Sequence, residues 1–222
     1  SAPEFQECLF QNVNVTNSSV VSISKSSTPK FFKCDWIACR SDITGVISVP
    51  EAFSGNVSLM SCQFLNNSGA SGAAIDVESH DGNVVLQNCS FEGNSVSGFG
   101  GALYINMDAT GSLFAYECSF RHNNASTGAG AIFVSRNSSA SFIGCKFNEN
   151  TATEGGAGGA ILLQYNAFLN FIDCEFSDNK ADADGGAIAV APLLGSTPVL
   201  RFDCCNFTQN QGRNGGALWI RN

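Results

Sequence analysis

Few side chains in this sequence could carry out acid–base chemistry together. Asp76, Glu78, His80 and Asp81 lie within six residues of one another, and two carboxyl groups in one groove could act as general acid and base on a polysaccharide. We interpret these groups as solvated loop charges, because carboxylates do not recur on adjacent copies of the repeat described below. A polysaccharide lyase or hydrolase stays open as an alternative, which two carboxyl groups about 5–10 Å apart in a surface groove would favour. The other titratable candidates stand alone in the sequence: Asp108, Arg121 and His122.

The sequence does not offer a complete set of metal ligands. Asp182 and Asp184, before Gly185, resemble part of a calcium-binding loop but lack the remaining oxygen ligands. Zinc sites combine closely spaced Cys and His, whereas here there is no Cys-x-x-Cys pair and only 2 His. We therefore predict no catalytic residue, no metal and no cofactor, and the chain is not expected to be an enzyme.

The charge balance argues against two classes of partner. The 222 residues include 11 Lys+Arg and 19 Asp+Glu, which gives a net charge of −8. Nucleic acid and anionic membrane surfaces bind clustered cations, and no apolar run approaches the roughly 20 residues of a membrane span. Residues 1–10 contain no initiator Met and no signal-peptide pattern. We expect a processed product or a piece of a longer chain.

An internal repeat of about 28 residues organises the chain. In each copy a Cys is followed two residues later by an aromatic residue, and in six copies it is followed five residues later by Asn. Successive Cys lie 26 to 31 residues apart while the Cys-to-Asn spacing is constant, so constant segments predict strands and variable segments predict loops. The six regular pairs are Cys62/Phe64, Cys89/Phe91, Cys118/Phe120, Cys145/Phe147, Cys174/Phe176 and Cys205/Phe207.

Two apolar pairs with period 2 complete each copy. One pair precedes the Cys, as at Val84 and Leu86, and the other follows a Gly-rich stretch, as at Leu103 and Ile105. Each copy therefore predicts three short strands, with a bend just before Cys89, where the parity changes. Because no helical period is present that could join parallel strands, we predict an all-β fold. It is a right-handed parallel β-helix, or β-solenoid, of about eight coils.

We predict a single domain over residues 1–222. Residues 1–61 hold two degenerate copies, with Cys39 standing in the second where later copies have Asn, and residues 62–222 hold the regular coils. Neither end shows a capping helix or a polar terminal repeat, which solenoids need. We expect flanking coils, from the same polypeptide or from another copy, and hence a longer rod or fibre.

Stacked coils would place equivalent residues in columns along the axis. The aromatic residues would form a buried column, and Gly-Gly before Ala would form a tight corner. Each Asn amide could bond its own turn and the coils on either side. The predicted Asn ladder is Asn67, Asn94, Asn123, Asn150, Asn179 and Asn210.

The repeated Phe-x-x-Asn with Gly-Gly-Ala-Ile/Leu resembles the tandem motif of the chlamydial polymorphic outer-membrane proteins and of secreted β-helix proteins of protists and algae. The motif covers residues 62–222 well and 1–61 weakly. Members of that chlamydial family are surface-exposed adhesins, so the resemblance implies a cell-surface role and no catalytic residues.

Eight Asn-x-Ser/Thr sequons predict N-linked glycans, and hence a secretory origin. None of the six ladder Asn is itself a sequon Asn, and Asn206 should face outward because it lies between inward Cys205 and inward Phe207. Corners rich in Asn and Ser could also produce sequons by accident. The predicted glycosylation sites are Asn14, Asn17, Asn56, Asn66, Asn88, Asn124, Asn137 and Asn206.

The second strand of each copy predicts an outward apolar strip. Parity also turns the Ala before each strand outward, as at Ala102, so a neighbouring rod, a partner protein, a sugar or a loop of the same chain could cover the strip. The residues that define this predicted partner face are Tyr104, Phe133, Leu162 and Trp219.

The ten Cys could form a disulfide framework or a column of buried free thiols. We favour thiols, because parallel stacked side chains suit disulfide geometry poorly. Cys39 and Cys204 lie outside the inward column, and either could cross-link to another chain.

These patterns together predict a non-catalytic extracellular or cell-surface structural glycoprotein that forms a rod or fibre by stacking β-helix coils. Its expected partners are flanking coils or other copies end to end, with a protein or carbohydrate as a lateral partner. A surface adhesin that displays loops for partner binding is the first alternative.

Overall fold

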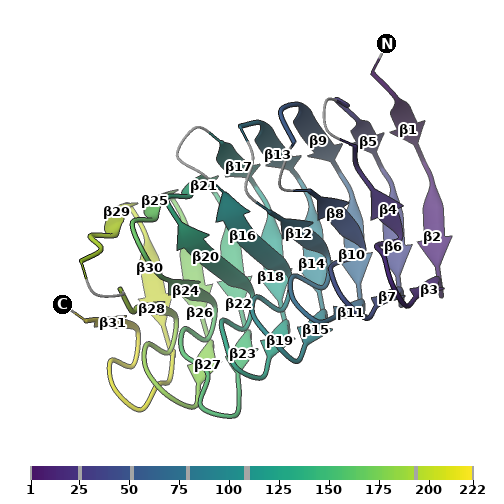
Figure 1. Cartoon of the computed structure of the whole chain (residues 1–222). Helices are drawn as coiled ribbons and strands as arrows, with labels where there is room; N and C mark the ends of the chain where they lie inside the picture. Colours follow the sequence, from purple (N-terminus) through teal and green to yellow (C-terminus); the bar gives the residue numbers. More distant parts are fainter. Residues whose placement is uncertain are drawn as a thin grey trace.

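The computed structural model describes residues 2–24, 27–50, 53–78, 81–107, 111–192 and 195–221 as a stack of parallel coils (Figure 1). The chain winds around one axis, and successive coils lie side by side from the N-terminal to the C-terminal end. No helix occurs among these residues. The predicted all-β parallel solenoid is confirmed.

Four parallel sheets run along the stack, and we name them A to D in the order in which the chain passes through them. Sheets A and B each contain one strand from all eight coils. Sheet A comprises β1 (Glu4–Gln6), β5 (Lys30–Phe32), β9 (Asn56–Met60), β13 (Asn83–Gln87), β17 (Ser112–Tyr116), β21 (Ser139–Ile143), β25 (Phe168–Ile172) and β29 (Val199–Asp203). Sheet B comprises β2 (Leu9–Gln11), β6 (Asp35–Ile37), β10 (Gln63–Leu65), β14 (Ser90–Glu92), β18 (Ser119–Arg121), β22 (Lys146–Asn148), β26 (Glu175–Ser177) and β30 (Asn206–Thr208).

Sheets C and D complete each coil. Sheet C comprises the two-residue strands β3 (Asn14–Val15), β7 (Arg40–Ser41), β11 (Ser68–Gly69), β15 (Ser95–Val96), β19 (Asn124–Ala125), β23 (Thr151–Ala152) and β27 (Lys180–Ala181). Sheet D comprises β4 (Val21–Ser22), β8 (Ile47–Val49), β12 (Ile75–Val77), β16 (Leu103–Met107), β20 (Ile132–Arg136), β24 (Ile161–Leu163), β28 (Ile188–Val190) and β31 (Leu218–Ile220). Sheet C corrects the prediction of three strands per coil to four, since a strand of two residues is too short to show a period.

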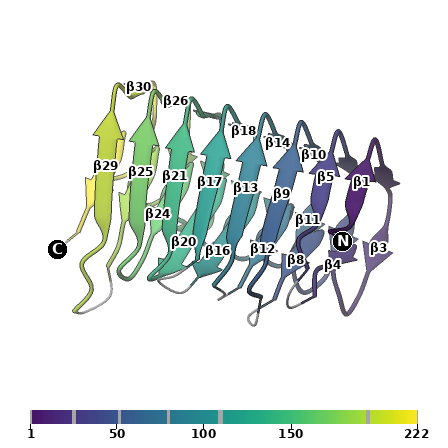
Figure 2. The ribbon, with the colours of Figure 1, turned by 90° about the horizontal axis from the view of Figure 1, so that it is seen from above.

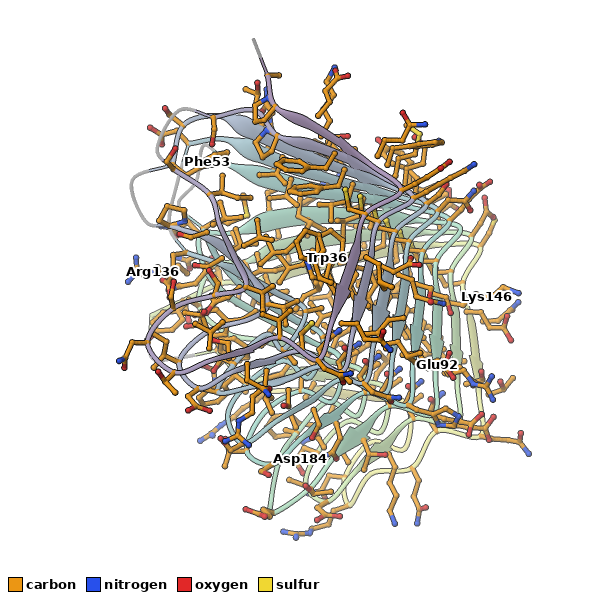
Figure 3. All side chains as sticks on the ribbon, turned by 90° about the vertical axis from the view of Figure 1, so that its right-hand side faces the viewer. Trp36, Phe53, Glu92, Arg136, Lys146 and Asp184 are labelled. Carbon is orange, nitrogen blue, oxygen red and sulfur yellow. The ribbon has the colours of Figure 1, made fainter. Side chains whose placement is uncertain are left out.

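The register between coils places like residues over like. Phe64 pairs with Trp36 on one side and with Phe91 on the other, and Phe91 pairs with Phe120. The rings stack face to face, with centroids 4.9 Å apart for Phe64 and Phe91 and 4.7 Å apart for Phe91 and Phe120. Figure 3 shows Trp36 inside the ring of strands. The predicted aromatic column is confirmed.

Two residues in each coil turn the chain through the left-handed backbone region. One stands before the Cys, as Asn88 does (φ 56°), and one stands before the ladder position, as Asn66 does (φ 55°). The predicted bend between Leu86 and Cys89 is therefore confirmed. Such a conformation costs a non-glycine residue roughly 1–2 kcal/mol, and the hydrogen bonds between coils offset this cost; the Asn88 amide, for example, donates to the Tyr116 carbonyl at 2.9 Å.

The corner between sheets C and D explains the Gly-Gly-Ala motif. Gly100 has φ +68°, and a Cβ on Gly101 would lie 2.1 Å from the Gly130 carbonyl oxygen of the next coil. The next two amides, of Ala102 and Leu103, both donate to the Ala131 carbonyl. This bulge shifts the side-chain parity by one residue, so Ala102 is fully buried in the core. The prediction that this alanine column faces outward is wrong.

The six ladder Asn form one column, which is buried from Asn67 to Asn179 and half-buried at Asn210. The four amides from Asn94 to Asn179 use their full hydrogen-bonding capacity. Asn123 Nδ2 donates to the Phe91 carbonyl at 2.9 Å and to Asn150 Oδ1 at 3.0 Å. Its Oδ1 accepts from the backbone amide of Asn94 at 3.1 Å and from Asn94 Nδ2 at 3.0 Å. An amide group has two donors and two acceptor positions, so no part of this buried side chain is left unpaired.

Replacing Asn123 by Ala should strongly destabilise the fold. The substitution leaves buried donors of Asn94 and a carbonyl of Phe91 without partners, which costs about 1–3 kcal/mol for each group. Chemical denaturation followed by circular dichroism measures the loss in the free energy of unfolding. Asn148→Ala is the matched control, because Asn148 is half-buried on sheet B and donates one bond, to Ser177. Equal losses in the two variants would contradict a special role for the ladder.

Candidate functional site

The sequon asparagines lie on the surface of the stack. Seven are exposed and Asn124 is half-buried. They occupy both sheets and corners: Asn206 lies on sheet B, whereas Asn66 and Asn88 are left-handed corner residues. Asn56 and Asn137 accept neighbouring side-chain bonds through Oδ1, from Asn83 and Asn166 respectively, whereas a glycan is attached through Nδ2. The geometry is compatible with sugar attachment at these sites, which stays a proposal.

Part of the predicted partner face is covered by the chain itself. Phe133 and Leu162 are each 4% exposed, and they pack with Ala129 and Ala157 from the segments that connect sheet C to sheet D. The Phe99 ring lies 4.8 Å from the Phe133 ring. Of the covers that the sequence left open for the outward strip, a segment of the same chain is the one that lies over Phe133 and Leu162. The period of a strand could not decide this, because it does not reveal the path of a long corner segment.

The two ends of that predicted strip are half-buried. Tyr104 stacks on Phe133 with ring centroids 5.4 Å apart, and Trp219 packs against the same small cluster. A lateral partner for these two residues stays a proposal.

One carboxyl group, that of Asp76, is buried on this outward side of sheet D. Asp76 is 3% exposed, and its Oδ1 atom has no hydrogen-bond partner. Burial, and secondarily the charge of Glu78 just after the strand, raise the pKa of Asp76 to about 8. Glu78 instead accepts a hydrogen bond from Asn106 Nδ2 at 3.2 Å. Asp76 therefore holds its proton at neutral pH and is no solvated loop charge, contrary to the sequence interpretation.

The other catalytic candidates contact a neighbouring coil, are exposed to solvent, or lie outside the described residues. Arg121 and His122 both approach Glu149 of the next coil, at 3.6 and 3.3 Å, so these two residues are not isolated. Asp184 Oδ1 accepts a hydrogen bond of 2.7 Å from Asn214 Nδ2, which ties two coils together. Asp182 and Asp81 are exposed. His80 and Asp108 lie outside the described residues.

A pair of carboxylates that sequence analysis missed shares one surface hollow. Glu117 and Asp173 are exposed corner residues that line a hollow of about 520 Å³ together with Tyr116 and Gly144. They are two coils apart, which corresponds to about 10 Å along the axis. The sequence interpretation that carboxylates do not recur on adjacent copies is wrong at Glu149 and Asp178, which both stand directly before a ladder Asn. The Glu117 and Asp173 pair is separated by the copy that carries Gly144.

All ten cysteines are free thiols. Burial raises the pKa of the Cys34 thiol, and the inward thiols donate to backbone carbonyls, as Cys174 does to Ile172 at 3.3 Å. Cys39 is buried at the start of the Asn column, where its backbone amide donates to Asn67 Oδ1 at 2.9 Å. Its predicted availability for cross-linking is therefore wrong, whereas Cys204 is exposed.

Neither a metal cluster nor a membrane-spanning helix is present in the part of the chain that the structure describes. No group of three His, Cys, Asp or Glu in these ranges could hold a metal ion. No helix there is long and apolar enough to cross a bilayer.

Two segments of the chain match a known family model. Residues 88–106 and 173–191 match the Chlamydia polymorphic membrane protein repeat. Each segment begins at or just before a left-handed corner residue and runs through sheets B, C and D of one coil. The resemblance of the repeats is thereby confirmed. No curated protein and no solved structure gave a significant match.

The buried carboxyl of Asp76 predicts a pH dependence of stability. The folded state keeps its proton up to pH about 8, whereas the ordinary pKa is 3.8. The free energy of unfolding should therefore fall as pH rises from about 4 to about 8 and level off above that range.

Thermal unfolding at pH 5 and pH 8 measures this dependence. The melting temperature should be higher at pH 5, and Asp76→Asn should remove most of the difference. Asp35→Asn, at a half-buried position on the outward face of sheet B, is the matched control and should leave the difference unchanged. A difference that persists in Asp76→Asn would contradict the assignment.

Proposed function

We propose that this chain is a non-catalytic extracellular or cell-surface structural glycoprotein whose coils stack into a rod. The observation that carries the proposal is the uninterrupted stacking of identical interior columns beneath a surface that bears the sequon asparagines. The matched repeat belongs to a family of membrane proteins by its name, which supports a place at a cell surface.

The two end coils favour extension of the rod. Phe202 and Ile220 are 36% and 63% exposed in the last coil. The equivalent residues of the preceding coil, Phe171 and Val190, are buried in the core. The strands β29, β30 and β31 each pair with a strand on one side only. A further coil, from the same polypeptide or from another copy, would bury these side chains and pair these edges. End-to-end contact is therefore part of the proposal.

The interior explains why such a rod would be stiff. Each ladder Asn from Asn67 to Asn179 bonds both neighbouring coils, and the aromatic rings stack without a gap from Phe10 to Phe207. Bending the rod would stretch both columns on one side. With about 4.8 Å per coil, the eight coils extend about 38 Å, so the chain is suited to act as a spacer.

A catalytic role is the second candidate, and the hollow between Glu117 and Asp173 favours it. Their spacing of about 10 Å approaches the 6.5–9.5 Å separation found in inverting glycosidases. Both side chains are exposed to solvent, whereas the general acid of such enzymes is usually sheltered in an apolar pocket. This exposure favours the structural role.

Secretion of the chain from a eukaryotic host tests whether the sequons carry N-linked glycans. Mass spectrometry of glycopeptides should find N-linked sugar at exposed sequons such as Asn206. Asn206→Gln should remove one glycan, while Asn210→Gln, a ladder position four residues away, should leave the glycan mass unchanged and lower the stability instead. A secreted, folded chain without sugar at any of the eight sequons would overturn the glycoprotein assignment.

Electron microscopy of the same secreted protein tests the rod. End-to-end contact predicts particles whose length increases in steps of about 38 Å at constant width. Single particles with no longer multiples at any concentration would contradict end-to-end contact of this chain.

Release of reducing ends from a panel of polysaccharides tests the catalytic alternative. The structural proposal predicts no release. Release that is lost in both Glu117→Gln and Asp173→Asn, but kept in Glu92→Gln on the outward face of sheet B, would establish the enzyme and contradict the proposed function.

A further inference from the structure

The outward face of sheet A carries an apolar patch among polar residues. Alternate residues of its strands point away from the core and are partly exposed, and Met60 and Tyr116 reach 39% and 38% exposure. Figure 2 shows this sheet as the layer nearest the viewer, with no other drawn element in front of it. The residues that form the apolar patch are Met60, Val85, Phe114, Tyr116, Ile143 and Ile172.

An uncovered parallel sheet of this composition needs a partner. Parallel sheets are normally covered on both faces, and sheet D of this chain is covered by its own corner segments. Contiguous exposed apolar patches on soluble proteins mark interaction surfaces. The outward face of sheet A is therefore the strongest candidate for a contact with another protein surface.

The size of the face suits a reversible pair of identical chains. The eight strands lie about 4.8 Å apart, and six of them are five residues long whereas β1 and β5 are three residues long, so that the face covers roughly 570 Å². Two copies packed face to face would bury about 1,100 Å², which is just below the range of stable specific interfaces and typical of transient ones. A second copy of this chain therefore fits the area, and the expected association is reversible.

The columns of the face are complementary to themselves when two rods run antiparallel. A two-fold axis parallel to the strands lays the first coil against the eighth and the fourth against the fifth. In the middle outward column, formed by equivalent residues of successive strands, Val85 then faces Phe114 of the other copy. In the next outward column Met60 faces Ile143.

Charge selects the antiparallel arrangement. The middle outward column begins with Glu4 and ends with Arg201, so the antiparallel pair sets these opposite charges against each other at both ends. Parallel rods would instead place Glu4 on Glu4 and Arg201 on Arg201, and like charges across an interface are unfavourable.

We propose that two copies of this chain associate through the outward faces of sheet A as antiparallel rods. The two outward columns that carry this pairing contain no sequon asparagine; Asn56 lies in the outermost column and Asn88 at the adjoining corner. A sugar at Asn88 would border the contact, whereas a sugar at Asn56 would lie on the outermost column of the face and confine the contact to the other two columns. The pairing is independent of end-to-end stacking, because it uses a different surface.

Sedimentation equilibrium of the folded chain, made with and without glycans, tests the pairing. The expected result is a monomer–dimer equilibrium in both preparations. Phe114→Glu should weaken dimerisation at least tenfold. The substitution places a charge in the apolar contact, opposite Val85 of the other copy. Leu65→Glu, at a half-buried outward position of sheet B, should leave dimerisation unchanged and is the matched control. Circular dichroism verifies that each variant is folded.

A charge exchange tests the antiparallel register even if Phe114→Glu fails to fold. Glu4→Arg alone should weaken the dimer, and Glu4→Arg combined with Arg201→Glu should restore it. A monomer at all concentrations, a dimer in the glycan-free chain alone, equal weakening by Leu65→Glu, or a charge exchange without restoration would each overturn the proposal.

Discussion

Hydrogen bonding between successive coils is the constraint on which this structure depends. Every strand finds its partners one repeat away in the sequence, so each coil must repeat the backbone path of the last. The Asn column enforces this most strictly, because the side-chain amide of Asn123 has all its donors and acceptors engaged by the two adjacent coils. A coil that departed from the common path there would leave buried polar groups unpaired.

This constraint separates the interior from the exterior. Inward columns of Phe, Cys and Asn recur in coil after coil, while outward residues are free to differ and give each sheet its own surface. Sheet D is covered by the long corner segments, sheet A presents an apolar patch among polar residues, and the sequon asparagines are distributed over sheets and corners. Surface residues can therefore vary from coil to coil on one scaffold without altering the core.

Sequence analysis predicted the structural features that depend on a constant spacing between residues of the repeat. The aromatic and Asn columns followed from the constant Cys-to-Asn distance, and the bend before Cys89 followed from the parity change, whereas its left-handed backbone was not predicted. The strands of sheet C are too short to have a period, and the alanine orientation depends on two amides sharing the Ala131 carbonyl. The cover over Phe133 and the pairing of Glu117 with Asp173 depend on contacts between copies that a single repeat does not contain.

Amide hydrogen exchange at the ladder tests the central claim most directly. The backbone amides of Asn94, Asn123 and Asn150 donate to the side-chain oxygen of the Asn in the next coil. If these bonds hold the coils together, these amides should exchange only through global unfolding, as slowly as the slowest strand amides. Rapid exchange at these positions in the folded chain would contradict the account.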